Sequence, residues 1–193
     1  LYPHRAGTEI PISGGTAEAD DGVRGAGRWS LMTEKMQAYF DAKDAAKRNA
    51  LLKELALACP PDGKDFFYRA FKRERYLDMK LTAVRGYAFY AREDEVAALM
   101  EKLLALLKKR PEKTPYNYQE YEVMRSRFLL PYLMETYGYP CFAAFHAQLE
   151  QQYDAMPEVF KNIFTCDERG NMRPLRDKQE VQKSLSEFFE GIK

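Results

Sequence analysis

Apolar residues recur at helical intervals along most of this chain. In the clearest example, Leu77, Leu81, Val84 and Ala88 are separated by four, three and four residues, so they would lie on one face of an α-helix. Similar stripes end at proline, glycine or basic residues, which are common at helix ends. The pattern predicts about eight helices, at about residues 33–58, 64–75, 77–91, 92–110, 117–137, 140–155, 157–164 and 177–189.

The polar stretch 41–49 interrupts the first of these stripes, so a break there would give two shorter helices. From Met32 onwards the chain has 17 leucines against seven valines and isoleucines, a ratio that favours helices over strands. No segment has the pattern of a β-strand. Helices joined by short turns pack as antiparallel neighbours. We therefore predict an all-α fold of stacked antiparallel hairpins, either an irregular α-solenoid or a helical bundle.

Residues 1–31 differ from the rest of the chain because they hold six of its eleven glycines and contain no Phe and no Met. The first Met of the chain is Met32. Such a composition resists regular structure, so an irregular N-terminal arm is predicted. Three interpretations stay open: a segment upstream of the true start, a leader joined to the protein, or a native arm. Residues 32–193 are predicted to form a single helical domain.

The segment 76–110 carries a family resemblance. Asp78 lies near the start of one predicted helix, and Val84-Arg85 follows before the small residues Gly86 and Ala88. An Asp near a turn and a later Val-Arg recur in HEAT-type helical repeats, which this segment resembles. No second copy follows at a period of about 40 residues. The resemblance implies a helical hairpin and is used for fold class only.

Composition and charge exclude several classes of protein. Thirty basic residues against 29 acidic ones give a net charge of +1, so no global field attracts nucleic acid or an anionic membrane. No apolar run reaches the roughly 18 to 20 residues needed to span a bilayer. No signal-peptide pattern opens the chain, and a cytoplasmic location is expected.

Common catalytic and cofactor motifs are also missing from the sequence. The three cysteines are far apart and include no C-x-x-C pair, and only two histidines are present, which indicates neither a disulfide framework nor a zinc site. The Walker A, dinucleotide, H-E-x-x-H, G-x-S-x-G and EF-hand signatures do not occur. We therefore expect no cofactor, and we assign no catalytic or metal-ligating residue.

Tyrosine is unusually frequent, and 12 of the 13 tyrosines follow Met32. Tyrosine and arginine are enriched at protein interfaces because each joins apolar area to a polar group. The leading hypothesis is a non-enzymatic protein–protein interaction module, of which an immunity or antitoxin protein would be one version. The residues predicted to bind an unknown protein partner are Tyr116, Tyr118, Tyr121, Arg125 and Arg127.

An alternative hypothesis is nucleic-acid binding by the stretch 64–85, where basic residues outnumber acidic ones by seven to three and alternate with aromatic residues. Such a pattern suits phosphates and stacked bases. The residues that would bind are Arg69, Lys72, Arg73, Arg75 and Lys80. A third hypothesis is an enzyme or metal site around His146 and Glu150, which are four residues apart on a predicted helix.

Overall fold

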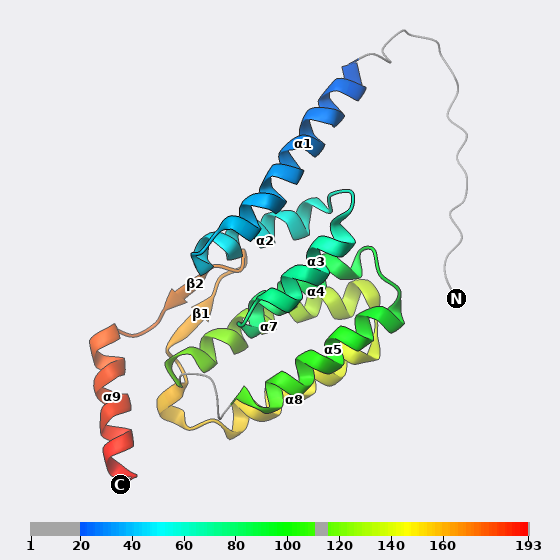
Figure 1. Cartoon of the computed structure of the whole chain (residues 1–193). Coiled ribbons are helices and arrows are strands. Elements are labelled where there is room, and N and C mark those ends of the chain that lie inside the picture. Colours follow the sequence, from blue (N-terminus) through cyan, green and yellow to red (C-terminus); the bar gives the residue numbers. More distant parts are fainter. Residues whose placement is uncertain (1–19, 111–115, 193) are drawn as a thin grey trace.

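The computed structural model describes residues 20–110 and 116–192, and the side chains of 27–110 and 119–192. Most of this part is helical, as the apolar spacing predicts (Figure 1). The helices are α1 (Asp20–Asp41), α2 (Ala45–Ala58), α3 (Gly63–Arg73), α4 (Leu77–Ala88), α5 (Glu93–Lys108), α7 (Tyr116–Tyr137), α8 (Pro140–Ala155) and α9 (Lys178–Gly191). A 3-10 turn, η1 (Glu158–Phe160), precedes the strands β1 (Phe164–Cys166) and β2 (Met172–Pro174).

The polar stretch 41–49 contains the expected break between two helices. Asp44 begins α2 as its N-cap, and its carboxylate accepts hydrogen bonds from the backbone N–H groups of Ala46 and Lys47. Aspartate is favoured there because it satisfies amides that have no partner inside the helix. The stop signal at Cys59-Pro60-Pro61 also ends α2 as predicted.

Helix α1 starts earlier than the composition predicts. It begins at Asp20, so the prediction of an irregular arm is wrong for residues 20–31. Each glycine within a helix costs only about 1 kcal/mol relative to alanine. That preference is too weak to prevent a helix when the neighbouring residues favour one. Residues 1–19 of the predicted arm lie outside the described residues.

The helix expected at 157–164 is reduced to the 3-10 turn η1 (Glu158–Phe160), and a short β-hairpin begins at Phe164. Strand β1 pairs antiparallel with β2, with Thr165 opposite Arg173. The expectation that no strand exists is therefore wrong, because three-residue strands are too short to leave an alternating pattern. The turn predicted at 167–171 is present, and the Asp167 carboxylate accepts hydrogen bonds from the backbone N–H groups of Arg169 and Asn171.

Helix α4 lies at the centre of the molecule and is buried along its whole length except at Arg85. It contacts α2, α3, α5 and α7, while α8 contacts α5 and α7 (Figure 1). Helices α4 and α7 run parallel, since Asp78 lies beside Arg125 and Arg85 lies over Tyr132. The hairpins α4–α5 and α7–α8 thus stack side by side around a shared apolar core, as predicted.

Two helices project from this body at opposite ends of the described chain. The N-terminal part of α1 extends beyond α2, and α9 lies beside η1 away from the stacked hairpins (Figure 1). None of the described helices is long and apolar enough to cross a membrane. The HEAT-type resemblance stays a prediction, as does the single-domain organisation of residues 32–193.

Candidate functional site

Helix α7 carries three buried charged residues, and each one fixes a different part of the chain. Glu120 accepts hydrogen bonds from the backbone N–H groups of Asn162, Ile163 and Phe164 at 2.5, 2.5 and 2.9 Å. The Tyr153 hydroxyl donates a fourth bond to Glu120 at 2.9 Å. A carboxylate that receives four donors is well compensated for its burial. Glu120 therefore anchors the start of β1 to α7.

Glu122 performs a similar task at the start of α4. Its carboxylate accepts the backbone N–H of Leu77 and an Arg110 N–H, both at 2.9 Å. The N-cap residue of α4, Tyr76, makes no capping bond with its own side chain. Burial raises the pKa of Glu122 to about 7, although Arg110 opposes the shift. The helix cap of α4 is thus supplied from α7, 45 residues away.

Arg125 is only 2% exposed, so the prediction that it faces a partner is wrong. Its Nε lies 3.8 Å from an Asp78 carboxylate oxygen, and its Nη1 donates to the backbone carbonyl of Gly170. Burial raises the pKa of Asp78, which the Arg125 charge opposes. Arg125 therefore holds the turn of the β-hairpin against α4 and α7.

The other residues of the predicted protein-binding set do not form one surface. Tyr121 packs edge-on against Phe164 of the hairpin, with ring centroids 5.4 Å apart. Arg127 lies toward α8, where it donates to both oxygens of Glu150 at 2.8 and 2.7 Å. The side chains of Tyr116 and Tyr118 lie outside the described residues.

The predicted nucleic-acid-binding residues are also divided. Lys80 is buried and donates to the backbone carbonyl of Phe71, so the prediction that it meets a ligand is wrong. Arg73 donates to three carbonyls at the end of α1. The three remaining members stay at the surface. Of these, Arg69 lies over the Phe40 ring, Lys72 lies over the Tyr68 ring, and Arg75 is exposed.

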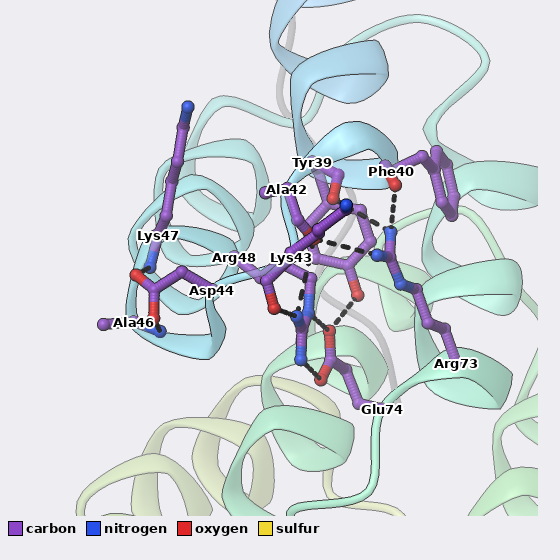
Figure 2. A network of polar contacts seen from close by, with 10 residues as sticks. All are labelled: Tyr39, Phe40, Ala42, Lys43, Asp44, Ala46, Lys47, Arg48, Arg73 and Glu74. Carbon is purple, nitrogen blue, oxygen red and sulfur yellow. Dashed lines mark hydrogen bonds and ion pairs between the residues drawn. The ribbon is translucent and has the colours of Figure 1, made fainter.

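A buried polar network joins α1, α2 and the residue after α3 (Figure 2). Glu74 accepts the Tyr39 hydroxyl at 2.5 Å and the Arg48 Nε at 2.8 Å. Burial, together with this carboxylate, raises the pKa of Tyr39. Arg73 caps the end of α1 by donating to the carbonyls of Tyr39, Phe40 and Ala42 (Figure 2). Because every group is used by a neighbour, this network serves the fold.

The third predicted site has a strong competing contact. His146 Nε2 and Glu150 Oε1 are 3.8 Å apart, as their helical spacing allows. Arg127 nevertheless occupies both Glu150 oxygens, which lowers the pKa of that carboxyl. Within 20–110 and 116–192, no group of three His, Cys, Asp or Glu side chains is placed to hold a metal ion.

The strongest candidate for binding is an exposed patch that the sequence did not single out. Lys53, Asp78 and Arg125 approach one another where the hairpin covers the α2, α4 and α7 layer. Helical spacing places four other residues on the same faces of α2, α4 and α7, one or more turns closer to the C-terminal ends of these helices. These residues are exposed or half-buried, and we name them the distal patch: Leu57, Arg85, Phe89 and Tyr132.

The distal patch is rich in exposed apolar surface. Leu57, Phe89 and Tyr132 are 68%, 60% and 41% exposed. The Arg85 guanidinium lies 4.1 Å from the centre of the Tyr132 ring. Leu57 falls off the apolar stripe of α2, whose buried members include Leu52 and Leu55. That mismatch was the available sequence signal for a surface-exposed leucine.

Comparisons with protein-family models, with curated proteins and with solved structures give no match.

Proposed function

We propose that this protein is a non-enzymatic protein-binding module, and that its partner docks on the distal patch. The observation that carries the proposal is the exposure of three large apolar side chains, Leu57 on α2, Phe89 at the end of α4 and Tyr132 on α7, on helices of which α4 contacts both others. Large apolar side chains grouped on a surface favour contact with another protein. Tyr and Arg at the centre of such a patch are typical of residues that dominate binding energy.

Three carboxylates on α7 and α8 are committed to contacts within the fold, which favours binding over catalysis. Glu120, Glu122 and Glu150 are each held by hydrogen-bond donors within the chain. Such carboxylates are poorly placed to act as a general base, because the base must reach a substrate proton. The three free cysteines are half-buried, and burial raises the pKa of each thiol. A raised thiol pKa disfavours the reactive thiolate.

Site-specific photo-crosslinking in the native cells tests this proposal. A photoreactive phenylalanine analogue replaces Phe89, and the matched control carries it at the exposed Glu101 of α5. We expect a discrete adduct of defined mass from position 89 and none of that mass from position 101. Adding Leu57→Ser should remove the adduct. No discrete adduct from position 89, or the same adduct from both positions, would overturn the proposal.

A further inference from the structure

Arg85 stands out among the arginines of the described chain. It is half-buried, yet it makes no hydrogen bond or ion pair to any residue that the structure describes. A guanidinium has five N–H donors and matches a carboxylate in a bidentate geometry. The other buried and half-buried arginines of 27–110 and 119–192 all have a carboxylate within 4 Å: Arg48, Arg110, Arg125, Arg127 and Arg176.

The stacking of Arg85 on Tyr132 leaves the edges of its guanidinium group free to donate. The Arg85 Cζ lies over the Tyr132 ring at 4.1 Å from its centre, and this contact uses none of the five N–H donors in a hydrogen bond. Stacking also restricts the side chain, so less rotamer entropy is lost when a ligand binds. Arg85 is thus oriented for an acceptor that the described chain does not provide.

A second cation lies on the same layer. Lys53 is half-buried one helical turn before Leu57, and it forms no ion pair within the described residues. Burial lowers the pKa of Lys53, and the Arg125 charge adds to this effect. Asp78 opposes both effects, so Lys53 has a carboxylate near it at the end of the layer that lies against the hairpin. Within the distal patch itself, Arg85 is the cation that no carboxylate of the described chain neutralises.

Resting on the proposed function, we infer that the distal patch binds an acidic segment of a partner protein. An Asp or Glu carboxylate of that segment pairs with Arg85, and a neighbouring apolar side chain packs against Leu57 and Phe89. Three adjacent helices at about 8 to 10 Å spacing give the patch a width of about 20 Å. About six extended residues or 13 helical residues cover that width.

A second copy of this chain fits the patch less well. In a symmetric dimer the same patch is present on both subunits, so the Arg85 side chains of the two copies would approach one another. Like charges placed together in a dry interface repel each other strongly. Charge complementarity therefore favours an acidic partner over self-association.

Selection from a library of random 15-residue peptides displayed on phage tests the inference, with the full chain as the target. Peptides selected by the wild-type protein should be enriched in Asp or Glu beside Leu, Ile or Phe. Their affinity should fall at least tenfold with Arg85→Gln and stay within twofold with Arg75→Gln, which removes an exposed arginine elsewhere. Arg85→Glu should select basic peptides instead.

The outcomes separate this inference from the proposed function. Selected peptides that lose affinity with Leu57→Ser but show no acidic enrichment would overturn the acidic partner and leave the docking surface in place. Acidic enrichment that persists with Arg85→Gln would also overturn the pairing of Arg85 with an acidic partner and leave the docking surface in place. Selection of no peptide that depends on Leu57 or Phe89 counts against both proposals. Circular dichroism should show that all variants are folded, since these side chains are exposed or half-buried.

Discussion

At the scale of single residues, the distinctive feature is the use of buried charges as connectors. Glu120, Glu122 and Arg125 lie within two turns of α7 and contact β1, α4 and the hairpin turn. Removing one partner of such a contact is costly, because the other polar groups stay buried without a bond. Residues that a sequence presents as surface charges therefore determine how distant segments assemble.

Glu120→Gln should destabilise the protein by about 2 to 4 kcal/mol. The amide has one acceptor oxygen where the carboxylate has two, so its NH₂ group faces either the N–H groups of Ile163 and Phe164 or that of Asn162. Tyr153→Phe, which removes one of the donors, should cost only about 1 kcal/mol. Urea unfolding followed by circular dichroism measures both changes. Equal losses in the two variants would contradict this account.

Glu122 should make stability depend on pH. Its pKa rises from 4.5 to about 7 on folding, so the folded state binds more protons than the unfolded state between these values. The unfolding free energy therefore falls as pH rises through this window, by on the order of 3 kcal/mol. The raised pKa of buried Asp78 acts in the same direction.

Urea unfolding at pH 5, 6, 7 and 8 compares the wild type with Glu122→Gln. The unfolding free energy of Glu122→Gln, relative to that of the wild type, should increase as pH rises, because the variant lacks the titrating group. The exposed Glu135→Gln serves as the control for loss of a charge. Wild-type and Glu122→Gln curves that stay parallel over this range would rule out the predicted titration.

At the scale of elements, the ends of helices and strands depend on a few specific contacts. Asp44 caps α2 with its own side chain, whereas α4 is capped by Glu122 and the carbonyls of α1 are capped by Arg73. The hairpin turn depends on Gly170, whose φ is +81°. The cap of α2 has a local sequence signal at Asp44, whereas residues distant in the sequence supply the caps of α4 and α1.

Gly170→Ala should destabilise the protein more than Gly138→Ala. Both glycines have positive φ, +81° and +66°, which costs a residue with a side chain about 1 kcal/mol or more. A Cβ at Gly170 would also come within 2.6 Å of the Phe128 ring, while nothing lies within 4 Å of one at Gly138. We expect losses of about 3 and 1 kcal/mol in urea unfolding. Similar losses would show that the ring contact is unimportant.

Arg73→Ala should loosen the end of α1. The guanidinium donates to the carbonyls of Tyr39, Phe40 and Ala42 at 2.7 to 2.9 Å (Figure 2), and loss of these bonds should cost about 1 to 2 kcal/mol. Amide hydrogen exchange in α1 should become faster, whereas the neighbouring Lys72→Ala should have little effect. Unchanged exchange in Arg73→Ala would show that water replaces the cap at no cost.

At the scale of the whole molecule, stability should be unevenly distributed. The stacked hairpins share a core centred on α4, while α9 packs mainly on η1 through Phe160, Phe188 and Phe189. A helix with few buried contacts can open without unfolding the rest of the protein. Val181 is the one residue of α9 that is fully buried, so α9 is expected to form a separate unit of low stability.

Native-state hydrogen exchange should therefore show much weaker protection in α9 than in α4. Phe188→Ala should lower protection in α9 and leave α4 unchanged, because it removes the ring contact with Phe160 at 5.2 Å. Phe142→Ala, at a fully buried position of α8, should lower protection in α4 by reducing global stability. Equal loss in both helices from Phe188→Ala would show that α9 unfolds only with the body.

The local sequence pattern is enough to predict the helical character of this protein and most helix ends. Apolar spacing, prolines, glycines and the cap at Asp44 act over a few residues, so their effect is present in the local pattern. The turn at 167–171 was predictable for the same reason, whereas three-residue strands are too short to show a period. The start of α1 at Asp20 was missed because glycine content gives only a weak preference against helix.

Which polar and apolar residues meet water depends instead on how the helices and the hairpin pack together. Arg125 and Arg127 are two residues apart on α7, yet one is buried against Asp78 and the other pairs with Glu150 of α8. Their positions differ by about 200° around the helix, and the sequence does not show which helix lies on which side. Leu57 and Phe89 are exposed for the same reason: exposure depends on what a neighbouring element covers, and no described element covers these two side chains.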